Sequence, residues 1–382
     1  MKIILSVEPV RFPLTGIGRY TYELAEHLRH HPDVNALRLF AGRRFIPGLP
    51  TASNHSGKGY GLKRAVQNTT LGIEGYRLLM PLLKGLALRG LDDHLYHSPN
   101  YYLPPFSGAR VATFHDLSPF TWPHCHAPKM VGFLQKELRK TLKLADALIT
   151  DSEYTRQELA RYFNWPLARI HAVPLASSGC FHPRPASQLS LVLERHGLQS
   201  GGYSLFVGTI EPRKNIEVLL NAYERLPDSL RQRFPLVLTG YYGWRNDSIH
   251  QRLAAAAAQG WARYLGFVPS DDLPVLFAGA RLFAFPSLYE GFGLPVLEAM
   301  ASGVPVVCSD SSSLPEVAGG AALLCAPEDV EGLCDQLRRG LEDETWRTGA
   351  IAAGLARARA FSWQRCAEET VAVYRQVMGP RQ

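Results

Sequence analysis

Short apolar runs alternate with helical patterns along the chain. The apolar runs predict one series of strands at residues 2–7, 36–40, 94–97, 110–114, 147–150 and 170–173, and a second series at 203–207, 235–239, 262–265, 282–285, 304–307 and 322–324. Helical spacing fills the gaps, for instance at 19–29, 130–143, 153–163 and 216–225. Strands that alternate with helices are typical of parallel sheets covered by helices on both faces. The pattern predicts an α/β fold with two Rossmann-like, doubly wound domains.

The segment 174–201 is rich in Pro, Ser and Gly, and it separates the two series of strands. We therefore predict an N-terminal domain at residues 1–182 and a C-terminal domain at 183–361. Ligands of open α/β sheets bind at the carboxyl ends of the strands. Two such domains are expected to face each other across a ligand-binding cleft.

The composition is that of a globular protein, with 46% hydrophobic and 20% charged residues among 382. Six cysteines are scattered without a Cys-x-x-Cys pair, so we expect neither a zinc site nor a disulfide framework. We therefore expect the protein to work in a reducing cytosol. We expect no signal peptide, because the first residues lack a long apolar core, and no membrane-spanning helix.

Positive charge is concentrated in the first half of the chain. Residues 1–185 hold 23 Lys and Arg against 13 Asp and Glu, whereas the remainder holds 18 against 21. A basic half indicates nucleic acid, an anionic membrane surface or an anionic substrate. The segment 71–91 mixes Leu, Met and Ile with Arg77, Lys84 and Arg89. It fits a helix on an anionic bilayer, and, since Pro81 interrupts it, a buried core helix remains the alternative.

The segment 287–307, SLYEGFGLPVLEAMASGVPVV, carries two carboxylates at the expected start of a helix. Glu290 precedes the helix and Glu298 lies about one turn inside it. A helix N-terminus after a parallel strand offers free N–H groups and partial positive charge to an anion. Carboxylates beside it accept hydrogen bonds from hydroxyl groups. The ligand suggested is a nucleotide sugar; the alternative is that both glutamates are solvated and only strengthen the helix start.

Three further segments follow predicted strands. In 207–215, VGTIEPRKN, Arg213 and Lys214 are placed to hold a diphosphate, or else they are surface cations at a turn. His115 and Asp116 end another strand, where a histidine is either a structural hydrogen-bonding group or a catalytic one. The glycines of TGIGRY lack the third glycine of a dinucleotide fingerprint, because Thr21 stands there. Amides near Gly16 approach a phosphate, or the loop is only a tight turn.

The spacing of Glu290 and Glu298 resembles the Glu-x7-Glu motif of the retaining GT-B glycosyltransferases of family 4. The resemblance implies that Glu290 bonds the donor hexose near its 3-hydroxyl and that Glu298 holds the ribose. Lys214 resembles the phosphate-binding lysine, while Thr209 stands where many relatives carry an arginine, so Arg213 could replace that arginine. The loop residues implied to touch sugar and phosphate are Gly291, Phe292, Gly293 and Leu294.

The resemblance also implies roles for residues of other loops. His115 would lie close to the donor's 6-hydroxyl, and Asp116 would orient it or approach the acceptor. The main chain at Phe267 and Val268 would hold the nucleotide base, and Gly240 would line the same cleft. A C-terminal helix at 362–382 would cross back to the first domain.

The segments GIGRYTYEL, FHDLSPF and GTIEPRKN resemble the bacterial branch that builds O-antigen and other surface polysaccharides. This implies a mannosyl- or rhamnosyltransferase using a GDP-hexose, with GDP-mannose first and a GDP-deoxyhexose second. The acceptor would be a lipid-linked oligosaccharide at the inner face of the cytoplasmic membrane, contacted through the basic N-terminal domain. No nucleic-acid partner, cofactor or metal is expected, since no Asp-x-Asp or Cys/His ligand set occurs.

Other functions remain open at this point. They are a UDP-sugar-dependent transferase of the same fold, a nucleotide-sugar 2-epimerase, and a non-catalytic nucleotide-sugar sensor. A dehydrogenase is disfavoured by the incomplete glycine fingerprint. No Asp or Glu nucleophile is identifiable on the reactive face, so we expect same-face displacement, in which the departing diphosphate helps to deprotonate the acceptor hydroxyl.

Overall fold

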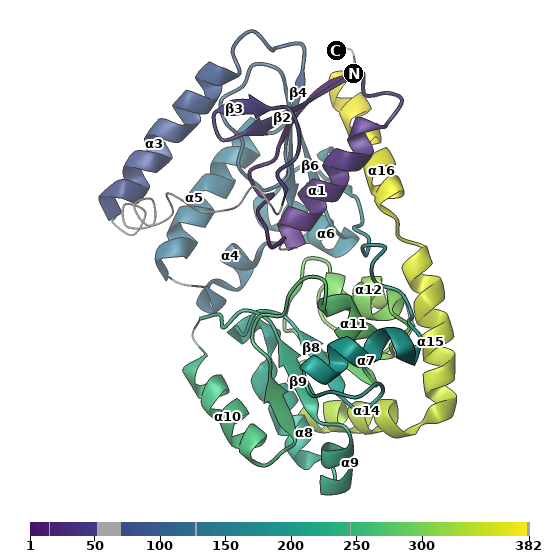
Figure 1. Ribbon diagram of the computed structural model, residues 1–382. Helices are drawn as coiled ribbons and strands as arrows, with labels where there is room; N and C mark the ends of the chain where they lie inside the picture. Colours follow the sequence, from purple (N-terminus) through teal and green to yellow (C-terminus); the bar gives the residue numbers. More distant parts are fainter. Residues whose placement is uncertain (15, 52–69, 127, 245, 380–382) are drawn as a thin grey trace.

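The computed structural model describes residues 1–14, 16–51, 70–126, 128–244 and 246–379. Residues 380–382 of the predicted C-terminal segment and the side chain of Arg77 lie outside this description. The chain forms two sheets of mostly parallel strands, stacked one above the other in Figure 1. The prediction of a two-part α/β fold is confirmed.

In the described part of the N-terminal half, one sheet has seven strands in the order β3-β2-β1-β4-β5-β6-β7. Every neighbouring pair is parallel except β2 with β3. The strands are β1 (Lys2–Ser6), β2 (Ala36–Ala41), β3 (Arg44–Ile46), β4 (Leu95–Ser98), β5 (Ala109–Phe114), β6 (Ala147–Thr150) and β7 (Ile170–Ala172). The short antiparallel β3 was not predicted, because three residues carry too little alternation to be recognised in sequence.

The C-terminal half carries six parallel strands in the order β10-β9-β8-β11-β12-β13. They are β8 (Ser204–Val207), β9 (Leu236–Thr239), β10 (Ala262–Tyr264), β11 (Leu282–Phe285), β12 (Val306–Ser309) and β13 (Ala322–Cys325). In both sheets the order reverses at a central pair, β1 with β4 and β8 with β11. This reversal is the point at which open α/β sheets bind ligands.

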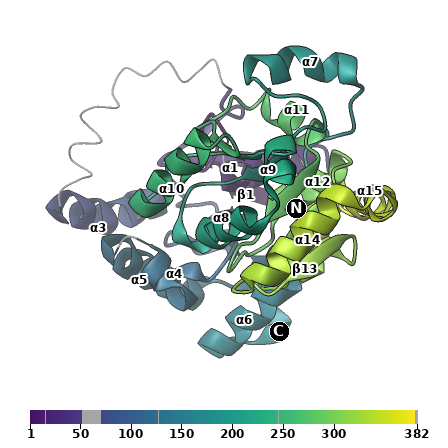
Figure 2. The same ribbon diagram turned by 90° about the horizontal axis from the view of Figure 1, so that it is seen from below.

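Helices cover both sheets. Those of the N-terminal half are α1 (Gly16–Arg29), α3 (Thr70–Ala87), α4 (Ser118–Thr121), α5 (Pro128–Leu144) and α6 (Glu153–Phe163). Those that follow are α7 (Ala186–Arg195), α8 (Ile216–Arg225), α9 (Asp228–Arg233), α10 (Asp247–Ala258), α11 (Leu273–Ala278), α12 (Leu294–Ala301), α13 (Leu314–Ala318), α14 (Val330–Glu342), α15 (Glu344–Arg359) and α16 (Trp363–Met378). Viewed from below, α6 and α7 lie on opposite sides of the molecule (Figure 2).

The last helix returns to the first half of the chain. The helices α15 and α16 run along one side of both sheets (Figure 1), and α16 packs on α1. Trp363, at the start of α16, is 6% exposed and lies against Tyr20, with ring centres 6.4 Å apart. The predicted crossing of the C-terminal helix is confirmed.

The segment 174–201, which we predicted only as a junction, contains the helix α7. Its leucines Leu189 and Leu193 are buried, and α7 packs on α11 of the C-terminal half. The turn residues around the helix obscured its short apolar stripe in the sequence. The domain boundary at 182/183 stays a prediction.

Candidate functional site

The loop between β11 and α12 forms the centre of the candidate site. Pro286 follows the last residue of β11, and the loop runs through Glu290 to Gly293, the residue before α12. Gly293 has φ 103° and ψ 44°, and a Cβ there would lie 2.5 Å from Leu314 Cδ2. A left-handed conformation with so little space favours glycine. This glycine lets the chain turn sharply into the helix.

The N-terminus of α12 has backbone amides without an acceptor among the described residues. The hydroxyl of Ser313 donates to the carbonyl oxygens of Glu290 and Phe292, at 2.9 and 2.8 Å, which fixes the loop from behind. Within the described part of the chain, no acceptor takes the amide hydrogens of Phe292, Gly293 and Leu294. Free amides at a helix start, with the helix dipole behind them, bind phosphate or other anions.

Two cations meet Glu290 beside this helix start. Lys214 Nζ lies 2.5 Å from Glu290 Oε1, and a guanidinium nitrogen of Arg213 lies 2.9 Å from Glu290 Oε2. Arg213 also donates to the carbonyl of Tyr289 at 2.6 Å and to Glu211 Oε1 at 2.8 Å. The 3-10 turn Pro212–Lys214 after β8 carries both cations, so the structure brings together two segments that lie 76 residues apart.

Burial and charge oppose each other in this cluster. Burial alone would raise the pKa of the Glu290 carboxyl, but Arg213 and Lys214 outweigh it and hold that pKa at about 2. Burial lowers the pKa of the Lys214 ammonium, and the Glu290 carboxylate counteracts part of this shift. Glu290 is therefore ionised at neutral pH and able to accept further hydrogen bonds, because each carboxylate oxygen has two acceptor positions.

The loop after β8 is packed tightly against the loop after β9. Gly240 has φ 147°, and a Cβ there would lie 2.0 Å from Gly208 O and 3.2 Å from Thr209 N. Thr209, in the loop after β8, is partly exposed. Gly240 is thus required by the close approach of two backbones, and its own contact with a ligand stays a prediction.

Phe267 and Val268 differ in their surroundings. The Phe267 side chain is 48% exposed, and its ring lies 5.0 Å from that of Tyr241, which is 46% exposed. Val268 is 5% exposed and packs in the core. Contact of the Phe267 and Val268 main chain with a nucleotide base stays a prediction. The exposed ring of Tyr241 was not predicted from the sequence.

Glu298 lies on α12 opposite the first turn of α1. Burial raises the pKa of its carboxyl to about 8, and the positive charge of Arg19 on α1 acts in the opposite direction. Gly16 begins α1 and is exposed, with no atom within 4 Å of a Cβ built on it. The first turn of α1 therefore lies near Glu298, while the ribose role of Glu298 and the phosphate role of Gly16 stay predictions.

His115 has both ring nitrogens engaged. Nδ1 lies 2.8 Å from Asp151 Oδ2, and Nε2 lies 2.8 Å from the carbonyl oxygen of Pro99. Burial lowers the pKa of His115, but the Asp151 charge and both hydrogen bonds outweigh it, so the net shift is upward. Two acceptors and a raised pKa favour the doubly protonated ring. A bond from this ring to a donor hydroxyl stays a prediction, and it would require one of these bonds to be exchanged.

The main chain beside His115 touches the Glu290 loop. A Cβ on Gly291 would lie 1.7 Å from His115 O, so only glycine fits there without a backbone shift. Ser152 and Thr155 donate their hydroxyl hydrogens to Gly291 O at 2.7 and 3.2 Å. The two halves of the chain are therefore in direct contact at the candidate site.

Asp116 belongs to a polar chain on the N-terminal wall. Its Oδ1 accepts from the backbone nitrogen and the hydroxyl of Ser118, at 3.0 and 2.8 Å. Nε2 of His126 lies 2.9 Å from the same hydroxyl. Trp244 of the other half donates its indole N–H to Cys125 O at 2.7 Å. These contacts place Asp116 where the two halves meet.

Tyr289, which was not singled out in the sequence, joins the two halves beside Glu290. Its hydroxyl accepts from Leu117 N at 2.9 Å and donates to Glu158 Oε2 at 2.5 Å. Asp151, Glu158 and Glu211 were also missed. An isolated acidic residue forms no recognisable sequence pattern. Asp151 could still have been noticed, because it directly follows the strand β6, where site residues of α/β folds tend to lie.

Among the described residues, no group of three or more His, Cys, Asp or Glu side chains is arranged to hold a metal ion. Metal independence stays a prediction.

Two protein families match the chain. The family "Glycosyltransferase Family 4" matches residues 14–176, and "Glycosyl transferases group 1" matches residues 195–356. The O-antigen chain mannosyltransferase B of Escherichia coli is 45% identical over 379 residues, which cover 98% of this chain and 100% of that protein. The serotype-specific mannosyltransferase WbdA of Escherichia coli is 33% identical over 261 residues, or 66% of this chain and 32% of WbdA.

Solved structures support the same fold. WaaG, a glycosyltransferase involved in lipopolysaccharide biosynthesis, superposes with a TM-score of 0.70 at 14% identity, over 99% of this chain and 100% of WaaG. Anabaena HepE in complex with UDP-glucose superposes with a TM-score of 0.72 at 18% identity, over 98% and 100%. The fold is the GT-B arrangement, and the chain belongs to the group 1 glycosyltransferases of family 4.

Proposed function

We propose that this family 4 glycosyltransferase moves a mannosyl unit from GDP-mannose, with retention of configuration, to a growing O-antigen chain. The observation that carries the proposal is the buried cluster in which Lys214 and Arg213 hold Glu290 beside the start of α12. Full-length likeness to an O-antigen mannosyltransferase supports mannose as the sugar. A GDP-deoxyhexose such as GDP-rhamnose is the second donor, and UDP-sugar transfer and 2-epimerisation are the alternatives.

In this scheme the diphosphate rests on the free amides of Phe292, Gly293 and Leu294, with Lys214 and Arg213 beside it. Glu290 accepts a hydroxyl hydrogen of the hexose, and Glu298 accepts from the ribose. The negative charge that develops on the leaving diphosphate is stabilised by groups already in place, which lowers the barrier without reorganisation. The departing phosphate oxygen takes the proton of the acceptor hydroxyl on the same face.

The remaining predicted residues complete the cleft in this scheme. The main chain near Phe267 and Val268 holds the base, with Thr209 and Gly240 on the rim. Amides near Gly16 approach the phosphate from the other half. His115 borders the hexose, and Asp116 receives the acceptor.

The donor is tested with the purified protein, a lipid-linked mannooligosaccharide acceptor, and one nucleotide sugar at a time. We expect transfer from GDP-mannose, retention of anomeric configuration by NMR of the product, and activity in excess chelator. Transfer only from a UDP-sugar would contradict the proposal in favour of a UDP-sugar-dependent transferase. Conversion of the donor into its 2-epimer without an acceptor would contradict it in favour of an epimerase. Donor binding without any turnover in the presence of acceptor would indicate a sensor.

We further propose that the protein sits on the inner face of the cytoplasmic membrane through α3 and α5, which lie side by side in both ribbon views (Figures 1 and 2). On α3, Leu79, Leu82 and Leu86 are 57%, 61% and 50% exposed at helical spacing. Arg89, which follows α3, and Lys136, Arg139, Lys140 and Lys143 of α5 are exposed cations. An exposed apolar stripe beside cations suits an anionic bilayer. No helix in the described part of the chain is long and apolar enough to span a membrane.

Flotation with vesicles tests this surface. We expect binding to vesicles that contain phosphatidylglycerol, weaker binding to pure phosphatidylcholine, and loss of binding in the double variant Leu82→Asp/Leu86→Asp. Leu191→Asp, at a 73% exposed position on α7, serves as the control. Equal binding of both variants would refute the assignment to α3.

A further inference from the structure

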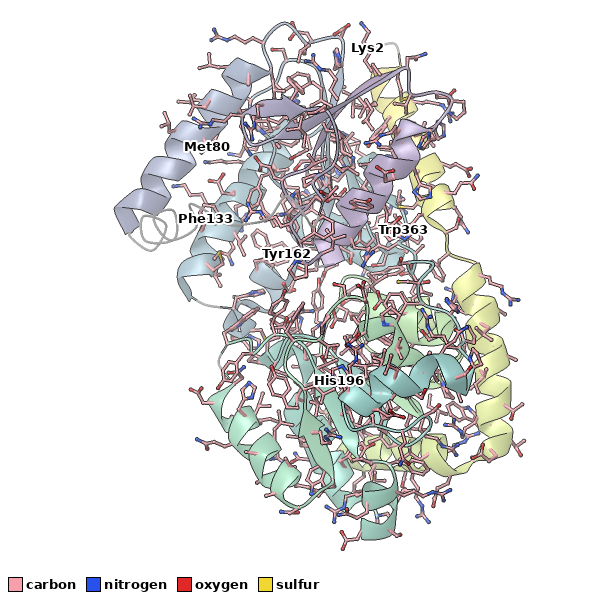
Figure 3. The ribbon with its side chains drawn as sticks, viewed as in Figure 1. Lys2, Met80, Phe133, Tyr162, His196 and Trp363 are labelled. Carbon is pink, nitrogen blue, oxygen red and sulfur yellow. The ribbon has the colours of Figure 1, made fainter. Side chains whose placement is uncertain are left out.

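One face of α6 carries tyrosines that the proposed donor site does not use. Tyr154, Glu158 and Tyr162 are spaced four residues apart, so they lie along one side of the helix over about 12 Å. Tyr154 is 39% exposed and Tyr162 is 45% exposed. Figure 3 labels Tyr162 close to the level at which the two halves meet. These residues, with Gln157 and Arg161, line a surface hollow of about 310 Å³.

The groups in this hollow alternate between aromatic faces and hydrogen-bonding side chains. Arg161 donates to Gln157 Oε1 at 3.2 Å, which holds the guanidinium and the amide at the surface. The Tyr162 ring is supported from behind by Phe120 and Phe163, at centre distances of 5.5 and 4.8 Å. A pyranose has apolar C–H faces and polar hydroxyl edges. An exposed, supported tyrosine suits the faces, and carboxylate, amide and guanidinium groups suit the edges.

The hollow is connected to the candidate site through Tyr289. The Tyr289 hydroxyl bonds Glu158, and its ring lies 6.3 Å from that of Tyr154 and 6.1 Å from that of Trp122. Tyr289 precedes Glu290 directly in the chain. Burial raises the pKa of Glu158 to about 7, with the Tyr289 hydrogen bond acting in the opposite direction. The α6 face thus begins at the loop that we assign to the donor and leads away from it along the N-terminal half.

We propose that this face, Tyr154 to Tyr162 of α6, is a glycan subsite that binds mannose units of the acceptor chain beyond the one that receives the new sugar. The subsite gives the enzyme a preference for longer acceptors, because additional units gain contacts that a single sugar cannot reach. The identity of the sugar rests on the proposed function. The location rests on the exposed rings, the hydrogen-bonding groups between them, and the link through Tyr289.

The test compares the binding of two soluble probes, methyl α-mannoside and an α-linked mannotetraose, by ligand-observed NMR titration. We expect Tyr162→Ala to weaken mannotetraose binding about five- to tenfold, the scale of losing one aromatic contact. Tyr162→Phe keeps the ring and should retain the affinity of the unsubstituted protein. Binding of methyl α-mannoside should be the same in all three proteins.

Because Tyr162 also packs on Phe120, the double variant Gln157→Ala/Arg161→Ala provides a test that leaves the core untouched. It should likewise weaken mannotetraose without lowering the melting temperature. Unchanged mannotetraose affinity in both variants, or no binding to the unsubstituted protein, would overturn the subsite. Absence of mannotetraose binding to the unsubstituted protein is also the result expected if this face binds a protein partner instead of a glycan. Failure of the proposed function is distinct, since it would appear as absent mannose transfer from GDP-mannose whatever the state of Tyr162.

Discussion

Replacing Lys214 by methionine removes one positive charge from the candidate site and keeps an unbranched side chain of similar length. The ammonium lies 2.5 Å from Glu290 Oε1 and 5.0 Å from the centre of the Phe285 ring, and the side chain is 11% exposed. It therefore acts in surroundings from which most water is excluded. A charge held in this way before the reaction stabilises the leaving diphosphate without reorganisation.

The expected effect is a fall in kcat of about 10²–10³, which corresponds to about 2.7–4 kcal/mol for losing one preorganised group. Protein stability should fall by less than the roughly 3–5 kcal/mol typical of a broken buried ion pair. Arg213 remains 2.9 Å from the other oxygen of Glu290 and keeps the carboxylate paired. Single-turnover rates with GDP-mannose, donor dissociation constants and melting curves separate the two effects.

Lys2→Met is the matched control, because Lys2 forms an ion pair with Asp93 in which both side chains are more than half exposed. An ion pair this exposed contributes little to stability, and its loss should leave kcat unchanged. If folded Lys214→Met retained more than about a fifth of the normal kcat, the assignment of the diphosphate to this cluster would be refuted.

Three other variants test separate parts of the site. Gly291→Ala should lower stability by about 1–3 kcal/mol and reduce transfer, because its Cβ would meet His115 O at 1.7 Å. Gly349→Ala is the control, since a Cβ there has no atom within 4 Å and should not lower stability. Equal melting temperatures of the two variants would contradict the assigned role of Gly291. Asp151→Asn should cost roughly 3–5 kcal/mol of stability by leaving protonated His115 without its buried partner; an unchanged denaturation midpoint would count against a charged pair. Burial raises the pKa of Glu298 from 4.5 to about 8, so the stability that its protonated form contributes is complete below about pH 4.5 and is lost as pH rises through 8. The melting temperature of Glu298→Gln, measured relative to that of the unsubstituted protein, should therefore rise between pH 5 and 9. Parallel pH profiles of the two proteins would exclude the pKa shift.

The sequence by itself determined the fold class and the two series of strands, and it indicated the residues that we propose for the donor site. Parallel strands are buried on both faces, so they appear as continuous apolar runs that need no knowledge of their neighbours. The Glu290 loop could be recognised for a similar reason. Gly293 and Pro295 suit the local turn into α12, and local geometry leaves a mark in adjacent residues, whereas Gly291 is required by the approach of His115 O from the other half.

Only the tertiary structure decided which distant groups pair with one another. Glu290 binds Lys214 and Arg213 because β8 and β11 are neighbours in one sheet, and His115 meets Pro99 and Asp151 because β4, β5 and β6 are neighbours in the other. The bond from Tyr289 to Glu158 depends on how the two sheets face each other. A single carboxylate or tyrosine has the same appearance in sequence whether it is solvated or buried against a partner. The helix α7 and the strand β3 were missed because short elements are stabilised by packing rather than by their own pattern. Local chemistry can therefore be read along the chain, whereas pairing, burial and the resulting pKa shifts arise only when the chain folds.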